Sequence, residues 1–216
     1  MELERHRVED FIARAAGAGS ATITELRRLP GGAIQENWLL DVDLSGGAFA
    51  GRLEAGLRTD ALSTIKTSLN RAEEFALIEI AQAAGVAVPR PLWLCREPKV
   101  LGKDFFVMRR VPGVASGYRL VRDERVQTNG EALVERLAQE LARIHTIRPP
   151  TSGLEFLTLP EPSPALSSVV RYRHDLDRVA SPHPVLEWGL RWLERNAPAK
   201  AELVLCHHDF RTGNYL

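Results

Sequence analysis

The first half of the chain alternates between one amphipathic helix and a series of extended stretches. Apolar residues recur at helical spacing over residues 6–16 and stop at Gly17-Ala18-Gly19, which predicts a short helix. Three extended stretches follow, and glycine-containing turns at 30–32 and 45–47 separate them. These stretches cover residues 22–29 and 37–44 and a third that ends near Arg58. The pattern predicts three antiparallel strands.

A second helix and two further strands are expected between residues 71 and 111. Residues 71–84 place Phe75, Ile78 and either Ala81 or Gln82 on one helical face, and Gly85 ends the helix. Residues 91–95 and 105–111 have strand character, and Pro112-Gly113 closes the second of them.

Beyond residue 113 the pattern becomes helical. Helices are predicted over residues 130–146, from Pro164 to about 179, and over residues 184–196, with a proline-rich loop over 149–164. A sheet-rich half followed by a helical half predicts an α+β fold with a hinge near residues 109–113. We place an N-terminal lobe at residues 1–110 and a helical lobe at residues 111–216.

Charge and composition exclude several classes of function. The chain has 28 basic and 28 acidic residues, so no net field attracts nucleic acid or an acidic membrane. No stretch approaches eighteen apolar residues, and the N-terminus has no signal-peptide pattern. Cys95 and Cys206 form no disulfide framework, and we expect both to be small buried residues in a reducing compartment. A soluble cytoplasmic protein is predicted.

The most informative stretch is the last ten residues, 207–216. His207, Asp209 and Asn214 follow the His-x-Asp-x-x-x-x-Asn spacing of a kinase catalytic loop. Phosphoryl transfer needs a carboxylate for the attacking hydroxyl and an oxygen ligand for Mg²⁺, and Asp209 and Asn214 fit those roles. Arg211 stands where a cation can reach the transferred phosphate. A zinc cluster is the weaker interpretation, since no matching ligand pair stands at zinc spacing.

Taken together, these motifs resemble the aminoglycoside/choline phosphotransferase family, which has a protein-kinase-like fold. The resemblance runs along the whole chain and is strongest for the phosphotransferase branch linked to acyl-CoA dehydrogenases. The motifs that carry it are Gly31-Gly32 followed by Asn37, Glu74-Phe75 ahead of residues 85–89, residues 91–95, Phe106-Val107-Met108 before Pro112-Gly113, and the terminal loop.

The resemblance implies an ATP- and Mg²⁺-dependent kinase that acts on a hydroxyl of a small molecule. In that case the backbone at Gly31 and Gly32, followed by Asn37, would lie over the phosphates. Arg58 would anchor them in a pair with Glu74, with Lys66 as the rival cation.

The resemblance also assigns adenine recognition to backbone groups of Met108, Arg109 and Val111. Asp209 would act as base, Arg211 as cation, and Asn214 as metal ligand.

Several of these residues have plainer interpretations. A glycine pair between strands is most often only a turn, and Glu74 can be one more solvated acid beside Glu73. Trp188 and Trp192 are interpreted as core residues and not as a ligand-binding pair. His208 replaces the glycine that the family most often has, which predicts an altered backbone conformation or altered access to the site.

The end of the sequence leaves two functional hypotheses. Leu216 follows Asn214 by two residues, and no second acidic metal ligand follows. We therefore expect this chain to be a fragment of a hydroxyl kinase and inactive by itself, with apolar surface exposed around Trp188, Trp192 and residues 203–206. The alternative is a non-catalytic kinase-like module that binds a nucleotide or a partner. The phosphate acceptor and the oligomeric state are left open.

Overall fold

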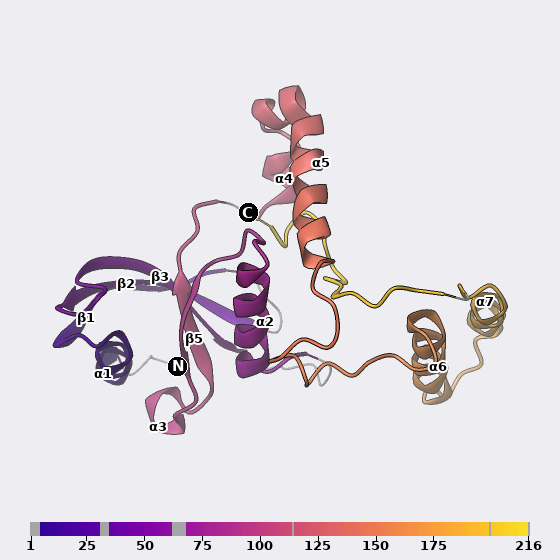
Figure 1. Cartoon of the computed structure of the whole chain (residues 1–216), viewed down its shortest axis with the longest axis horizontal. Coiled ribbons are helices and arrows are strands. Elements are labelled where there is room, and N and C mark those ends of the chain that lie inside the picture. Colours follow the sequence, from indigo (N-terminus) through magenta and orange to yellow (C-terminus); the bar gives the residue numbers. More distant parts are fainter. Residues whose placement is uncertain (1–4, 31–34, 62–67, 114, 199, 216) are drawn as a thin grey trace. The chain divides into compact units, whose positions relative to one another are not determined.

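The computed structural model describes residues 5–30, 35–61, 68–113, 115–198 and 200–215 (Figure 1). The chain divides into two compact units. The first comprises residues 1–146 and 206–216, and the second comprises residues 147–205.

The first unit is built on a five-stranded antiparallel sheet, as the sequence predicted. Its strands are β1 (Ser20–Arg28), β2 (Gln35–Ser45), β3 (Gly51–Asp60), β4 (Pro91–Cys95) and β5 (Phe105–Arg109). Their order across the sheet is β1-β2-β3-β5-β4, so the central strand β3 pairs with both β2 and β5. Strand β3 therefore lies between β2 and β5, two strands that are far apart in the sequence.

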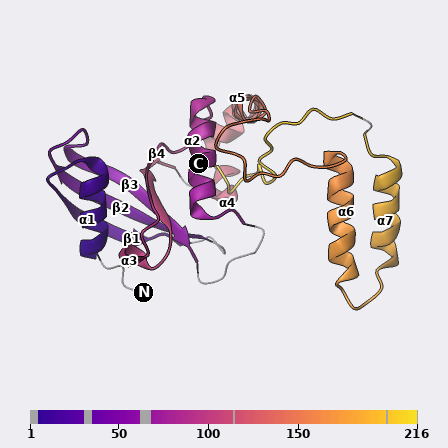
Figure 2. The ribbon, with the colours of Figure 1, turned by 60° about the horizontal axis from the view of Figure 1, so that its bottom comes forward.

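Two helices, α1 (Arg5–Ala16) and α2 (Arg71–Ala83), lie on opposite faces of this sheet (Figures 1 and 2). The alternation of side chains along β5 shows this division. Phe105 packs edge-on against Phe11 of α1 with ring centres 5.2 Å apart, and Phe106 packs edge-on against Phe75 of α2 at 5.8 Å. The main apolar core lies on the α1 face, which leaves the α2 face free to carry polar residues.

The start of α2 is fixed by local sequence. Asn70 accepts hydrogen bonds from the backbone N–H groups of Ala72 and Glu73, and the Glu73 side chain accepts from the N–H of Asn70. This capping box satisfies the exposed donors of the first turn. The next residue, Glu74, consequently projects from the first turn at a defined position beside the sheet.

Three further helices complete the described part of the first unit. They are α3 (Pro98–Leu101), α4 (Gly117–Leu120) and α5 (Glu124–Ile144). The single-turn helices α3 and α4 are too short to produce a hydrophobic period and were not predicted. Helix α5 begins six residues earlier than predicted. Asn129 interrupts it with φ −123° and ψ 30°, so its regular part begins at the predicted start.

A buried carboxylate fastens α5 to the segment that follows α2. Glu140 accepts hydrogen bonds from the backbone N–H of Ala87 at 2.8 Å, from Arg136 Nε at 2.8 Å and from Arg143 Nη1 at 2.6 Å. Burial raises the pKa of Glu140, but these three hydrogen bonds outweigh it, so the pKa lies below that of an ordinary glutamate.

Replacing Glu140 by Gln should destabilise the first unit. The single Gln oxygen can serve either the two arginines or the N–H of Ala87, and its NH2 group then faces the remaining donor side. An unpaired buried donor costs roughly 1–3 kcal/mol. Because the pKa of Glu140 is lowered on folding, its contribution is present above the ordinary glutamate pKa and is lost as the pH falls through the folded value. Urea unfolding at neutral and acidic pH checks this. An unchanged midpoint at neutral pH would contradict it.

The second unit contains a helical hairpin of α6 (Pro164–Asp177) and α7 (Pro184–Arg195), whose helices lie side by side in Figure 2. Val169 and Leu190 are its buried apolar side chains, and Arg173 pairs with Glu194 at 3.3 Å. Trp188 and Trp192 are 71% and 56% exposed, so their interpretation as core residues is wrong for this chain. They lie on the side of α7 away from the contact with α6, which agrees with the expected exposed surface.

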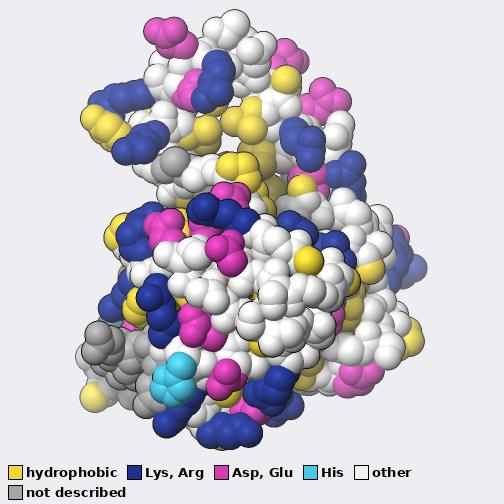
Figure 3. All heavy atoms as spheres, turned by 90° about the vertical axis from the view of Figure 1, so that its left-hand side faces the viewer, with side chains coloured by type: hydrophobic (Ala, Val, Ile, Leu, Met, Phe, Trp, Pro, Cys, Tyr) yellow, Lys and Arg dark blue, Asp and Glu magenta, His cyan; other side chains and the backbone are white. Residues whose placement is uncertain are grey.

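The cysteines also differ from one another. Cys95 is buried in the sheet core, where burial raises the pKa of its thiol. Cys206 is exposed, contrary to prediction, because the apolar run before it forms no strand and its members are only partly buried. No helix among the described residues is long and apolar enough to cross a membrane. Cationic and anionic side chains are interspersed on the face drawn in Figure 3.

Candidate active site

The terminal loop is folded on itself by short-range contacts. Asn214 donates its backbone N–H to the carbonyl of Arg211 at 3.0 Å, and Gly213 supplies the positive φ of 107° that this turn needs. The rings of His207 and Phe210 pack edge-on, with centres 5.5 Å apart. His207 therefore acts as a packing residue in this loop.

His208 adopts a left-handed backbone conformation. Its φ is 61°, a region that glycine enters freely and other residues enter at a cost. Among the described residues it is the one non-glycine residue with a positive φ. His208 therefore occupies a conformation that suits a glycine, with a larger side chain. Its expected effect on the backbone or on access to the site stays a prediction.

The Asp209 carboxylate is held by two partners within the loop. Arg211 donates from Nε to Oδ1 at 2.9 Å, and Asn214 donates from Nδ2 to Oδ2 at 2.7 Å. Asn214 Nδ2 also donates to the backbone carbonyl of Asp209 at 2.8 Å. The hydrogen bond from Asn214, followed by that from Arg211, lowers the pKa of Asp209. The side chain is 60% exposed and ionised at neutral pH, so a hydroxyl can approach its remaining lone pairs.

These contacts determine which way the Asn214 amide points. A carboxylate and a carbonyl only accept hydrogen bonds, so the amide nitrogen must face Asp209. The amide oxygen, Oδ1, is then directed away from these acceptors. Amide oxygens are suitable ligands for Mg²⁺. The loop thus presents a carboxylate and a neutral amide oxygen together.

The loop lies against α4, which sequence reasoning did not foresee. A Cβ atom at Gly117 would come within 3.2 Å of Thr212 Cγ2, so these two positions are in close contact. Thr212 also exchanges a hydrogen bond with the Tyr215 hydroxyl at 3.0 Å. Gly117 follows the predicted hinge by only a few residues, so α4 links the hinge segment to the terminal loop.

The predicted pair of Arg58 and Glu74 is confirmed as a contact. Arg58 Nη1 lies 2.6 Å from Glu74 Oε1, and Arg58 Nε donates to Asn37 Oδ1 at 2.7 Å. Asn37 and Arg58 are direct partners in the β2–β3 register, and Phe106 lies opposite Arg58 on β5. These contacts use two of the five guanidinium N–H groups, so donors are left for an anion.

Arg71 is a member of this cluster that the sequence analysis missed. Its side chain is only 1% exposed, and its guanidinium pairs with the Glu74 carboxylate and donates to the carbonyl of Leu69. Arg71 Nε also lies 3.0 Å from Asp60 Oδ1, within ion-pair distance but without hydrogen-bond alignment. Glu74 is thus shared between two arginines. The spacing of three residues between Arg71 and Glu74 was the available signal.

The predicted hinge residues lie at the end of β5 and just after it. Met108 pairs with Gly56 in the sheet, and the N–H of Arg109 donates to the carbonyl of Arg90 at 2.8 Å. The N–H of Arg110 donates to the carbonyl of Glu54 at 3.1 Å. Val111 carries the next backbone N–H. Among the described residues, this N–H has no backbone hydrogen-bond partner. Pro112 has none to offer, so Val111 is the last donor of the hinge.

The strand register places the side chains of Arg58 and Met108 on one face of the sheet. Side chains alternate along a strand, so Glu54, Gly56 and Arg58 of β3 face the same side. Between the charged positions lies Gly56, where a Cβ atom would come no closer than 3.7 Å to Met108. Because Gly56 has no side chain, the surface between Arg58 and Glu54 has no projecting group there and is bordered by the apolar side chain of Met108.

Some predicted residues lie outside the described part of the chain. These are Gly31, Gly32 and Lys66. Within the described ranges, no three His, Cys, Asp or Glu side chains form a metal-ligand cluster.

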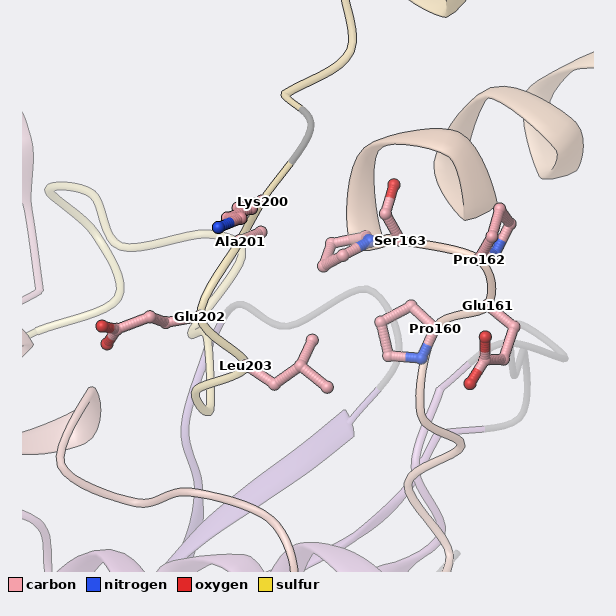
Figure 4. Close-up of a pocket in the computed structure, with 9 residues that line it drawn as sticks. Pro160, Glu161, Pro162, Ser163, Lys200, Ala201, Glu202 and Leu203 are labelled. Carbon is pink, nitrogen blue, oxygen red and sulfur yellow. The ribbon is translucent and has the colours of Figure 1, made fainter.

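A hollow of about 620 Å³ lies in the second unit, between the segments 160–164 and 200–203 (Figure 4). Four of its nine lining residues, three prolines and Leu203, are apolar and bulky, and Leu203 points toward Pro160, whereas Glu202 points away. None of the predicted site residues lines it. Its polar groups do not converge, so we assign it no chemistry.

The chain matches the sequence model of a known protein family. The sequence model of the phosphotransferase enzyme family (APH) matches residues 25–216. The chain belongs to that family. The match begins in β1 and includes every predicted site residue.

Two curated relatives carry acyl-CoA dehydrogenase names. Acyl-CoA dehydrogenase family member 10 of Mus musculus is 26% identical over 168 residues, which cover 74% of this chain and 15% of the relative. Acyl-CoA dehydrogenase family member 11 of Gallus gallus is 30% identical over 141 residues, which cover 62% of this chain and 17% of the relative. The chain thus spans a small part of the length of these relatives.

A solved structure shows the same fold. A "putative aminoglycoside phosphotransferase" of Ralstonia eutropha JMP134 superimposes with a TM-score of 0.68 and 16% identity, over 97% of this chain and 59% of that one. This chain therefore has the kinase-like α+β fold that its sequence predicted.

Proposed function

We propose that this phosphotransferase transfers the γ-phosphoryl group of ATP to a hydroxyl of a small molecule, with Asp209 as base. The observation that carries the proposal is the Asp209 carboxylate, held by Arg211 on one oxygen and by Asn214 on the other. This arrangement fixes an ionised acceptor for the hydroxyl proton, next to a cation and an amide oxygen.

Each loop residue has a defined part in this reaction. Asp209 orients the hydroxyl and accepts its proton as the new bond to the γ-phosphorus forms, while the bond from that phosphorus to the bridging oxygen breaks and ADP leaves. Arg211 has guanidinium donors beyond its bond to Asp209, and these can offset charge on the transferred phosphoryl group. Asn214 Oδ1 would hold Mg²⁺, which supplies positive charge against the phosphate oxygens.

The face of the sheet supplies the nucleotide half of the site. Arg58, steadied by Asn37 and Glu74, anchors the α- and β-phosphates through its remaining donors. The adenine ring rests on the low surface at Gly56 and Met108 and meets the hinge at Arg109 and Val111. Gly31 and Gly32, which the family resemblance assigns to the phosphates, lie outside the described residues. In this scheme residues 1–110 form the nucleotide lobe and residues 111–216 part of the acceptor lobe.

The acceptor that we favour is a hydroxyacyl thioester and not a polycationic aminoglycoside. The names of the curated relatives point to acyl-CoA chemistry in the proteins that share this sequence. Helix α6 carries Arg171, Arg173 and His174 beside Asp175 and Asp177, so its own charge is not strongly acidic and does not favour a polycation.

A transfer assay with labelled ATP tests the proposal. The protein is incubated with γ-labelled ATP, Mg²⁺, and either a hydroxyacyl-CoA or an aminoglycoside. We expect label on the hydroxyacyl compound, and none when Asp209 is replaced by Ala. Label on the aminoglycoside would overturn the acceptor class, and transfer that is independent of Asp209 would overturn the mechanism. Binding of ATP without transfer to either acceptor would favour the non-catalytic module.

A further inference from the structure

Four charged side chains form a connected group on the face of the sheet that we assign to the nucleotide. Asp41 of β2 is only 1% exposed, and each of its oxygens has one arginine partner. Oδ1 lies 2.9 Å from Arg110 Nη1, and Oδ2 lies 2.8 Å from Arg52 Nη2. Arg110 also pairs with the Glu54 carboxylate. Burying a carboxylate without partners costs much free energy. The two arginines offset that cost for Asp41.

Arg110 is the residue through which this group reaches the hinge. It stands between Arg109 and Val111, the two positions whose backbone groups meet adenine in the proposed site. Its N–H donates to the carbonyl of Glu54 at 3.1 Å, and its guanidinium bonds Asp41 and Glu54. The chain leaving β5 is therefore fixed to β3 through its backbone and to β2 through its side chain.

We propose that Asp41 and Arg110 are positioning residues that hold the hinge in the conformation that binds adenine. The inference rests on the proposed function, because it assigns the hinge of that site. Neither side chain needs to touch the nucleotide: Asp41 is buried, and it acts through Arg110 on the backbone at Arg109 and Val111. Without this tie the two residues after β5 lose their side-chain anchor, and the following Pro112-Gly113 provides no N–H from Pro112 to replace it.

The expected effect is on the adenine end of the nucleotide and not on the phosphate end. If removal of the tie leaves the hinge in its binding conformation roughly a tenth of the time, affinity for adenosine falls about tenfold. Tripolyphosphate, which Arg58 would bind at the other end of the site, should keep its affinity. A general loss of folding would weaken both ligands together.

The test measures binding of adenosine and tripolyphosphate separately to the 216-residue chain by titration calorimetry. Asp41→Asn and Arg110→Met should lower the affinity for adenosine about tenfold and leave tripolyphosphate within twofold, whereas Arg110→Lys should recover part of the loss. The matched control is Arg52→Ala. It removes a bond of nearly the same length to the same carboxylate, 2.8 Å against 2.9 Å, but has no link to the hinge, and it should bind both ligands as the unmodified chain does.

The outcomes distinguish the positioning role of Asp41 and Arg110 from the proposed nucleotide site on which it rests. Wild-type protein that binds neither ligand would refute the proposed nucleotide site. Wild-type binding with no loss of adenosine affinity in Asp41→Asn and Arg110→Met would refute the positioning role alone. An equal loss in Arg52→Ala would also refute it, because the effect would then follow Asp41 burial and not the hinge. Should Asp41→Asn fail to fold, Arg110→Met and Arg110→Lys decide the question.

Discussion

Replacing Asp209 by Ala should lower turnover by roughly a hundredfold to ten-thousandfold in any version of the chain that transfers phosphate, with ATP affinity nearly unchanged. The carboxylate acts on the acceptor hydroxyl, and its contacts within the loop are to Arg211 and Asn214. Its loss therefore removes the proton acceptor and frees both neighbours, but takes no contact from the nucleotide. Steady-state kinetics with the acceptor at saturation measure the effect on kcat.

Two further variants make this prediction specific. Asn214→Ala should lower kcat and raise the Mg²⁺ concentration needed for half-maximal rate, since it removes the amide oxygen assigned to the metal. Asp175→Ala is the matched control: this aspartate is exposed to a similar extent and pairs with Arg178 three residues away, but lies on α6. Turnover by Asp209→Ala that equals that of Asp175→Ala would rule out the assigned base.

Replacing Arg58 by Ala should have the largest effect on nucleotide binding. Hydrogen bonds to a charged group contribute roughly 1.5–3 kcal/mol each, so loss of one phosphate contact should weaken ATP roughly tenfold to a hundredfold. Glu74 retains Arg71 as a partner, which limits the damage to the fold. Equilibrium titration with ATP and with adenosine checks the assignment, because adenosine has no phosphates and should bind unchanged.

The controls for Arg58 test charge against geometry. Arg58→Lys keeps the positive charge but cannot reproduce the planar donors that bond Asn37 and Glu74, so we expect intermediate affinity. Arg28→Ala removes a comparable strand arginine, which pairs with Glu36 at 3.2 Å outside the proposed site, and should leave ATP binding intact. Equal losses in Arg58→Ala and Arg28→Ala would mean that net charge, not the anchoring pair, governs affinity.

The parts of the fold with strong local patterns were predictable from the sequence. Alternating apolar residues and glycine turns indicated all five strands. The strands depend on residues close in sequence, where spacing determines geometry. The contact between Arg58 and Glu74 was implied by the family resemblance and not by local spacing.

The features that the sequence did not predict, or predicted wrongly, depend on long-range strand register or on what packs against a surface. The tie between Asp41 and Arg110 joins positions 69 residues apart and exists because β3 brings β2 and β5 together, which no local pattern reveals. Trp188 and Trp192 have the spacing of core residues, but spacing does not show whether anything packs against them. Cys206 was misjudged for the same reason.

The central claim is that one chain binds ATP through Arg58 and performs chemistry through Asp209. Titration of ATP with Mg²⁺ into the 216-residue protein and its Arg58→Ala and Asp209→Ala variants tests it most directly. The account predicts binding by the unmodified protein, similar binding by Asp209→Ala, and binding weakened at least tenfold in Arg58→Ala. Absence of ATP binding to the unmodified protein, or equal affinity in all three, would contradict it.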